Sequence, residues 1–459
     1  MSFGYPIPVR FLTPLVVLYV WVQAAFPDIE RRVYWGEFLV LLLLPSIVRA
    51  KYRHPCQGKT IRMVYFMLFV IPVFSVLYTL TFWNDEYDSY FLLRHLAMFH
   101  YIIFFFFAYR YADRLLVTMA RFFWVPLLFL IPVIGLSSVG HSLPLGLSIS
   151  AIGGTVLLSW LYLGYVKRCE SYRSALMGFA VLIALIALLD PRSTNIAIVV
   201  VLLLLVPFVR LLKYWHRLVP LPMRRLLVFT GAAVCVAGLW LVLGFLGREI
   251  HENVALEIKM LRIPELAGAD FGEFEGTRAF TSALWRASYW GYLLYRLSEH
   301  PFGLGLGTPM FEHGLENVMA VGRLDTVTVE YQAFTMGAHN SFITLLVRVG
   351  MIFLIPLIVS GLAVIKMISR YWRTCSYRPL SSREGRVVFG SIVAFIVVVI
   401  QAMFNVVIET PLYAALFWFS FGLMTRLVGD FVVAIDDRGQ TSGYEQWAVM
   451  GVATPDPIR

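Results

Sequence analysis

Runs of about twenty apolar residues recur along most of the chain, and they constrain its fold more than any other feature. A run of that length crosses the hydrocarbon core of a bilayer as an α-helix, because a helix satisfies its backbone polar groups internally. The expected fold is therefore an all-α polytopic membrane protein. We predict about twelve spans, over residues 9–26, 33–50, 63–82, 91–109, 121–140, 146–166, 174–190, 195–212, 226–247, 340–365, 388–408 and 412–433.

Composition and charge agree with this class. Hydrophobic residues make up 59% of the 459 residues and charged residues 14%, whereas soluble domains have roughly 45–50% and 25%. The net charge of +10 would suit a nucleic-acid partner in a soluble protein, but in a membrane chain the basic residues are expected to gather on the cytoplasmic side. We therefore expect no nucleic-acid partner.

The basic residues also predict the orientation of the spans. With the N-terminus in the cytoplasm, the short loops on the opposite side carry only Arg31, Arg32 and Arg192. This asymmetry predicts that both termini are cytoplasmic. The same orientation places on the cytoplasmic side the basic segments 51–62, 109–114, 167–173, 213–225 and 366–386.

One long segment, residues 248–339, interrupts the series of short loops on the predicted outer side. Loops longer than about 15 residues are usually functional or contain structure of their own. Its stretch 281–301 has aromatic and apolar residues at helical spacing before Pro301, which predicts one amphipathic helix. We divide the chain into an N-terminal nine-helix membrane region, this outer loop, a C-terminal three-helix membrane region and a cytoplasmic tail, with bounds 1–247, 248–339, 340–433 and 434–459.

A His-Asn pair, His339 and Asn340, stands where the tenth predicted span begins. Asn340 is a good N-cap, since its side-chain oxygen can accept from free N–H groups of the first helical turn. The positive end of the helix favours an anion nearby and a neutral imidazole, so His339 could act as a base. The alternative is an ordinary interfacial cap, and helix geometry alone does not decide between the two.

Helix geometry does distinguish two later residues of this span. In a continuous helix Gly350 lies about 20° from His339 around the axis, whereas Arg348 points about 180° away. Gly350 would let a neighbouring helix approach beneath His339. Arg348 is a poor candidate for contact with a substrate there.

Two arginines are candidates for binding an anion at the same membrane face. Arg192 opens the eighth span, where a permanent cation is costly unless it is paired or binds something anionic. Arg286 lies four residues before Trp290 on the predicted loop helix, so the two share a face. The structural alternatives are a pair between Arg192 and Asp190 or a lipid phosphate, and a solvated Arg286 packed on an aromatic ring.

Other polar patterns favour structural roles. The sequence GLGLG follows no strand, so it indicates a tight turn rather than a nucleotide-binding loop. The acidic segment 84–88 is better explained as a solvated loop than as a metal site, and we expect no metal or cofactor. Buried pairs inside the bundle are expected among a small set of ionisable residues on the second and fourth spans, namely Glu37, Arg94, His95 and His100.

Two of these segments resemble a known family. RASYWGYLLYRLSEHPFGLGLG, residues 286–307, resembles the loop signature of the bacterial O-antigen ligase and O-antigen polymerase superfamily: an arginine, an aromatic four residues on, His-Pro and a glycine-rich turn. HNSFITLLVRVGMIF resembles the family's second pattern of His-Asn, nine residues, Gly, two residues, Gly. His339, Asn340 and Gly350 match it, whereas Phe353 stands where the ligases usually have a small residue.

The resemblance covers roughly residues 174–365, including an arginine at the start of a span in DPRSTNIAIVV that is similar to one in the family. It implies a bacterial inner-membrane glycosyltransferase of the C-type fold, which moves an oligosaccharide from undecaprenyl diphosphate to an acceptor hydroxyl at the periplasmic face. His339 would be the base, and Arg192 and Arg286 would bind the diphosphate. The expected supporting residues are Asn340, Trp290 and Gly350.

The acceptor stays open at this stage. A carrier-linked glycan as acceptor would make the protein a polymerase, and lipid A-core would make it a ligase; Phe353 favours the polymerase slightly. Other expected partners are membrane lipids and polysaccharide-assembly proteins. Two further classes are a transporter of the lipid-linked glycan, which the lack of a recognisable internal repeat disfavours, and a structural scaffold.

Overall fold

The computed structural model describes residues 9–25, 35–47, 54–82, 89–125, 151–189, 290, 293–310, 340–374, 382–404, 407–408 and 411–440. These parts of the chain form helices and turns, and no strand occurs among them. The protein is thus helical, as predicted, with helices long and apolar enough to cross a membrane at Pro55–Thr81, Phe91–Arg110, Met351–Arg373, Arg383–Met403 and Tyr413–Ile435. The predicted spans 195–212 and 226–247 lie outside the described residues.

The elements follow one another along the chain with short turns in several places. Their order is α1 (Val9–Ala25), α3 (Trp35–Leu43), η1 (Leu44–Ser46), α4 (Pro55–Tyr65), η2 (Phe66–Val70), α5 (Ile71–Thr81), α6 (Ser89–His100), α7 (Ile103–Arg110), α8 (Ala112–Phe122), α10 (Ala151–Arg168), α11 (Tyr172–Leu189), α18 (Ser341–Val349), η4 (Met351–Phe353), α19 (Leu354–Thr374), α20 (Arg383–Phe404) and α21 (Pro411–Gln440).

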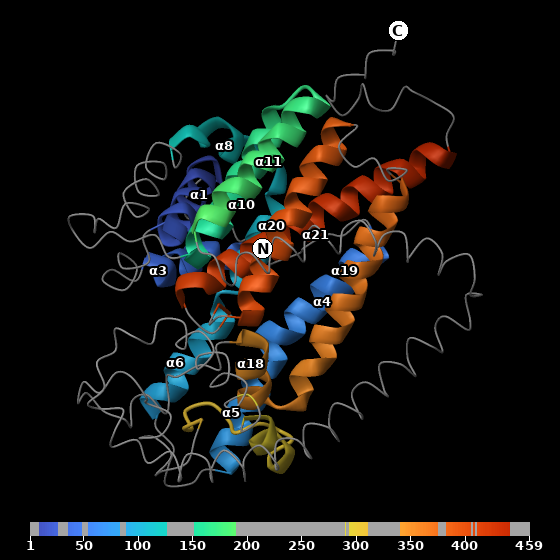
Figure 1. Cartoon of the computed structure of the whole chain (residues 1–459). Coiled ribbons are helices and arrows are strands. Elements are labelled where there is room, and N and C mark those ends of the chain that lie inside the picture. The colour runs from blue at the N-terminus through green and yellow to red at the C-terminus, as the bar shows by residue number, and fades with distance from the viewer. Residues whose placement is uncertain are drawn as a thin grey trace, which may run out of the picture.

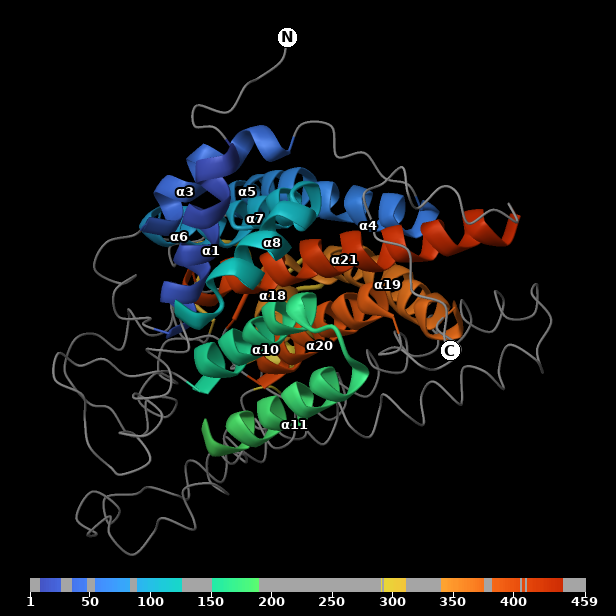
Figure 2. The ribbon, with the colours of Figure 1, turned by 90° about the horizontal axis from the view of Figure 1, so that it is seen from above.

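Helix α21 lies between two groups of helices. It packs against α7 on one side and against α20 on the other, and α10 packs on α20 (Figures 1 and 2). The contact with α7 is a backbone contact, since a Cβ at Gly422 would lie 2.2 Å from the carbonyl oxygen of Phe105. Helix α21 also contacts α10, because the buried Trp160 of α10 donates from Nε1 to Oγ of Ser420 in α21 at 2.9 Å. The core of the described bundle is built around this helix.

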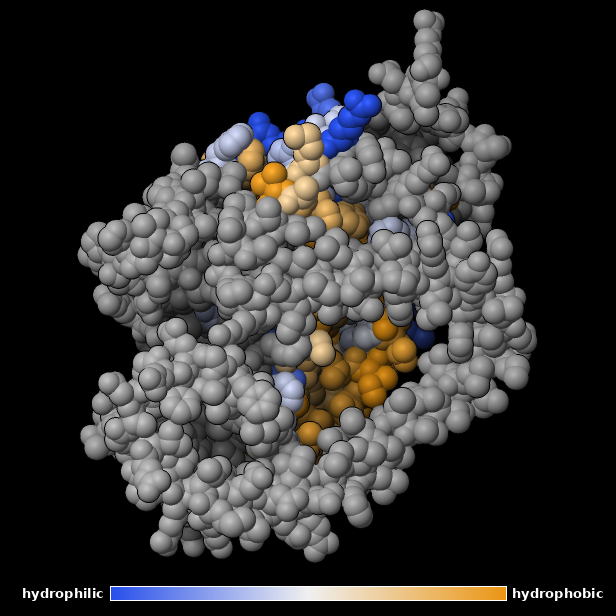
Figure 3. Space-filling view, in the orientation of Figure 1, coloured by the Kyte–Doolittle hydropathy of each residue, from blue (hydrophilic) through white to orange (hydrophobic). Residues whose placement is uncertain are grey.

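The outward faces of several helices are apolar. Phe69, Val73 and Leu77, on η2 and α5, are 52%, 58% and 60% exposed, and Ile355 at the start of α19 is 57% exposed. In Figure 3 apolar side chains gather over the lower part of α19 and its neighbours, whereas hydrophilic side chains gather at the upper end, where α10, α11 and α20 meet. Exposed apolar side chains on helices of this length are expected where helices of a membrane protein face lipid.

Helix α4 begins at Pro55, whereas the apolar run predicts a start at residue 63. The reason is a capping box. His54 Nδ1 accepts from the N–H of Cys56 at 3.1 Å, and the N–H of His54 donates to Gln57 Oε1 at 2.9 Å. Proline suits the first helical position because it has no N–H to leave unsatisfied. The polar segment before the apolar run is therefore the first turns of the same helix.

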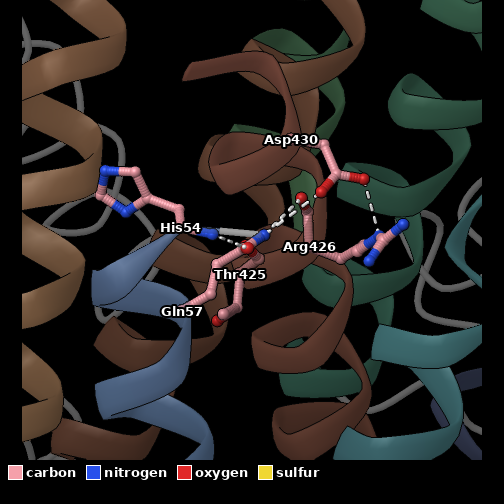
Figure 4. A network of polar contacts seen from close by, with 5 residues as sticks. All are labelled: His54, Gln57, Thr425, Arg426 and Asp430. Atoms are coloured by element: carbon pink, nitrogen blue, oxygen red, sulfur yellow. Dashed lines mark hydrogen bonds and ion pairs between the residues drawn. The ribbon is translucent and has the colours of Figure 1, made fainter. Parts of the chain in front are cut away.

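Gln57 also joins α4 to α21 at the predicted cytoplasmic end (Figure 4). Its Nε2 donates to the carbonyl oxygens of Thr425 and Arg426, both at 3.3 Å. Arg426 pairs through Nε with Asp430 Oδ2 at 2.7 Å, one turn further along α21. Helix α21 continues beyond this pair to Gln440, so the first residues of the predicted cytoplasmic tail, which starts at 434, are helical. A helix that leaves a bilayer keeps its internal hydrogen bonds in water, so loss of apolar character does not mark its end.

Contacts near the helix ends join segments that the sequence places on the same side of the membrane. Arg386 at the start of α20 donates from Nη2 to the carbonyl oxygen of Cys169 at 3.0 Å, and Arg383 donates to that of Lys167 at 3.1 Å. These carbonyls lie at the C-terminal end of α10, where cations are favourable. The orientation of the two sides relative to the cytoplasm stays a prediction.

The single helix predicted over 340–365 is wrong. Helix α18 ends at Val349, Gly350 has φ +85°, and α19 begins only at Leu354 after the 3₁₀ turn η4. A Cβ at Gly350 would lie 2.1 Å from the carbonyl carbon of Phe302, so a second stretch of backbone occupies that space. The expectation that Gly350 shares a helical face with His339 therefore fails. The backbone that approaches Gly350 is a turn of the outer loop and not a neighbouring helix.

Replacement of Gly350 by alanine should destabilise the protein strongly. Left-handed backbone costs a non-glycine residue about 1–2 kcal/mol, and the added Cβ would also overlap backbone of Phe302, which cannot rotate away. We expect Gly350→Ala to lose at least about 2 kcal/mol in thermal unfolding of the purified protein in detergent. The matched control is Gly361→Ala in α19, where a Cβ meets nothing within 4 Å; a loss as large there as at Gly350 would contradict the argument.

Candidate functional site

The two segments that carry the family resemblance pack against each other. Residues 293–299 are helical, and the turns of residues 301–310 fold over the C-terminal end of α18 (Figure 1). Three backbone hydrogen bonds join them: Leu304 N–H to Val347 O at 2.8 Å, Gly305 N–H to Arg348 O at 3.0 Å, and Met351 N–H to Pro301 O at 2.8 Å. Residues 293–310 and α18 thus form one substructure.

An apolar cluster fills the space between the loop helix and α18. Its buried members are Leu293, Leu297, Met310, Leu346 and Val347. Trp290 packs against this cluster, as do residues from both segments. The sequence predicted Trp290 as a supporting residue on an amphipathic helix, and the described residues 293–299 with Pro301 following agree with that helix.

The glycine-rich sequence 303–307 forms a tight turn, as predicted. Gly303, Gly305 and Gly307 have φ of +90°, +93° and +82°. A Cβ at Gly303 would lie 2.5 Å from Arg348 O, so glycine is needed for both the backbone conformation and the close approach. We refer to residues 303–307 as the glycine turn.

Every N–H from Leu304 to Gly307 has a protein acceptor. The first two donate to carbonyls of α18, as described above. Leu306 N–H donates to Thr79 Oγ1 of α5, and Gly307 N–H donates to His95 Nδ1 of α6, each at 2.9 Å. Loops that bind phosphate present free N–H groups to it. These four amides therefore do not form a phosphate cradle.

Asn340 caps α18, which confirms the prediction from sequence. Its Oδ1 accepts from the N–H groups of Phe342 and Ile343 at 3.1 and 3.2 Å. His339, Arg192 and Arg286 lie outside the described residues. Their predicted roles accordingly stay predictions, although His339 directly precedes the cap and Arg286 precedes Trp290 by one helical turn in sequence.

Ser341 is a residue of this region that sequence reasoning missed. It is fully buried, and its Oγ accepts from the N–H groups of Val407 at 2.7 Å and Ile408 at 2.9 Å. These amides belong to the connection between α20 and α21. The start of α18 is thereby fixed to two core helices. The only signal in the sequence is a hydroxyl directly after the His-Asn pair.

Arg348 has a structural role here. It is buried, 2% exposed, with Nη1 donating to Thr308 O at 2.8 Å. Thr308 directly follows the glycine turn. Arg348 thus holds the turn through its side chain as well as through its carbonyl.

One of the predicted pairings is present, but its side chains are 29% and 41% exposed, so the expectation of a buried pair is wrong for it. His100 Nε2 lies 2.8 Å from Glu37 Oε2, and the hydroxyl of Tyr101 donates to Glu37 Oε1 at 3.1 Å. His95 contributes to the glycine turn, because its Nδ1 accepts from Gly307 N–H. Among the described residues, no three His, Cys, Asp or Glu side chains gather as a group that could hold a metal ion.

No protein-family model matches this chain, and no curated protein matches it either.

Removal of the Ser341 hydroxyl should destabilise the protein. Ser341→Ala would leave the buried amides of Val407 and Ile408 without their acceptor, and an unsatisfied buried donor costs about 1–3 kcal/mol. We expect a loss of that size in thermal unfolding. Ser360→Ala is the matched control, since Ser360 is 5% exposed and its Oγ has no hydrogen-bond partner in the described parts of the chain. Equal losses of unfolding free energy in the two variants would show that the hydrogen bonds of Ser341 do not stabilise the protein.

Proposed function

We propose that this chain is a bacterial inner-membrane glycosyltransferase of the O-antigen ligase and polymerase type. In this proposal it transfers an oligosaccharide en bloc from undecaprenyl diphosphate to an acceptor hydroxyl at the periplasmic face, with inversion and without a metal. The observation that supports it is the packing of residues 293–310 on α18, because these are parts of the two segments that resemble the family.

The reaction can be written with the candidate residues. The acceptor oxygen attacks the anomeric carbon from the face opposite the diphosphate, a new C–O bond forms, and the bond from that carbon to the diphosphate oxygen breaks. The acceptor proton passes to the imidazole of His339, as a general base requires. The diphosphate leaves as a stable anion, so it needs cations rather than a strong acid. Arg192 and Arg286 are the candidates, because guanidinium groups bind phosphate oxygens in a bidentate manner.

Phe353 gives little guidance on the acceptor. It is 4% exposed, lies in the 3₁₀ turn η4 and packs in the main hydrophobic core. The sequence predicts Phe353 within one continuous helix over 340–365, and that helix is interrupted at Gly350. The preference for a polymerase over a ligase therefore depends on the family resemblance alone.

Variants of the three candidate residues should lose transfer. In a detergent assay with lipid-diphosphate-linked glycan and acceptor, we expect His339→Ala, Arg192→Ala and Arg286→Ala each to lower the rate by about 10²-fold or more. Arg114→Ala, an exposed arginine of α8, is the control and should keep full activity. Full activity in all three candidate variants would refute the proposal. Product formation without two compartments would also separate a transferase from a transporter.

The acceptor can be identified from surface polysaccharide in a strain that lacks the protein. If the protein is the proposed polymerase, gel analysis should show single repeat units attached to the cell-surface lipid, because chains no longer grow. Long chains that remain unattached to that lipid would instead identify a ligase. Return of the wild-type pattern with the His339→Ala protein would contradict both assignments.

A further inference from the structure

Two buried polar side chains from the N-terminal helices hold the glycine turn. Thr79 near the end of α5 is 4% exposed, and His95 on α6 is 7% exposed. They accept from Leu306 and Gly307, which follow them in the chain by 227 and 212 residues. From this geometry we propose that Thr79 and His95 are positioning residues of the candidate site, which fix the glycine turn and hence the loop helix that carries Trp290. The proposal rests on the proposed function for its activity measurement.

The chemistry of each acceptor fits this role. The Thr79 hydroxyl donates its own proton to Ser75 O at 2.7 Å, so an oxygen lone pair is left to accept from Leu306 N–H. His95 accepts at Nδ1, which requires the neutral tautomer with its proton on Nε2. A side chain without an acceptor at either position would leave a buried N–H of the turn unsatisfied.

The glycine turn is held from two directions at once. The amides of Leu304 and Gly305 bind the carbonyls of Val347 and Arg348 on α18, and its last two amides bind α5 and α6. Pro301, just before the turn, adds a third contact to this side, because its carbonyl oxygen accepts from Met351 N–H. A shift of the turn would therefore move the loop helix relative to α18. These two elements lead directly to Arg286 and His339, the residues proposed to act on the donor and the acceptor.

Transfer should depend strongly on this alignment. Displacement of reacting groups by about 1 Å can lower an enzymatic rate by about 10²-fold even when the change lies far from the chemistry. Thr79 and His95 are not expected to touch the substrate. They act through the position of the turn, so loss of their acceptor atoms should lower kcat more than it raises KM.

The test compares variants that keep an acceptor with variants that lack one. His95→Asn retains an oxygen near the position of Nδ1 and Thr79→Ser retains the hydroxyl, whereas His95→Leu and Thr79→Val retain neither. Hydrogen–deuterium exchange of the peptide that covers residues 301–310 reports the turn directly, without any assay of activity. Transfer kinetics on the same full-length proteins report the effect on the site.

We expect faster exchange of the turn and a kcat lower by about tenfold or more in His95→Leu and Thr79→Val. His95→Asn and Thr79→Ser should restore protection and most of the rate. Thr81→Val is the matched control on α5, because the Thr81 hydroxyl is exposed and bonds only within its own helix to Leu77 O. If His95→Leu does not fold, Thr79→Val tests the same turn through the adjacent amide.

The outcomes separate this inference from the proposed function. Unchanged exchange of the turn in the Leu and Val variants would overturn the inference. Faster exchange with unchanged kcat and KM would also overturn it, since the turn would then have no influence on transfer. If the wild-type protein shows no transfer at all, the proposed function fails, and the turn then has no role in transfer. The exchange data would still decide whether Thr79 and His95 hold the glycine turn in place.

Discussion

The hydrogen bonds between the glycine turn and the end of α18 are the constraint on which the arrangement of residues 293–310 and α18 depends. A helix that stops inside a protein leaves carbonyl groups without intrahelical partners, and an apolar environment makes this costly. Helix α18 stops at Val349, and the turn supplies N–H groups to its final carbonyls. This arrangement requires glycine at position 350, because a Cβ there would overlap the backbone of Phe302.

Much of the helical framework follows from the sequence because membrane helices are specified by long apolar runs. Helices α1, α10 and α20 begin and end within a few residues of their predicted spans. The break at Gly350 was missed because the apolar run continues through it, and hydropathy contains no information about which backbone lies alongside. Similarly, the early start of α4 depends on the capping box of His54 and Gln57, which lies in a polar segment that a search for apolar residues passes over.

In the candidate site, contacts between residues close in the chain were predicted, whereas contacts between residues far apart in the chain were not. The cap by Asn340 needs only the next three residues, and it was predicted correctly. The partners of Ser341, Thr79 and His95 lie 66 to 227 residues away in the chain. No single sequence pattern relates such pairs, so the bond between His95 and a backbone amide of the glycine turn was not predicted. Polar side chains within spans indicate that a partner exists but do not identify it.

The full use of the turn's amides restricts how a diphosphate could be bound at this site. A glycine-rich turn beside a helix end is a common place for phosphate, but here the N–H groups of residues 304–307 already have acceptors. Arg348 is buried with a guanidinium bond to Thr308 O, so its charge supports the turn. In the proposed transferase, backbone dipoles of the turn therefore contribute little to the leaving group. The compensating charge must come from side chains that reach the donor from elsewhere, which is the role proposed for Arg192 and Arg286.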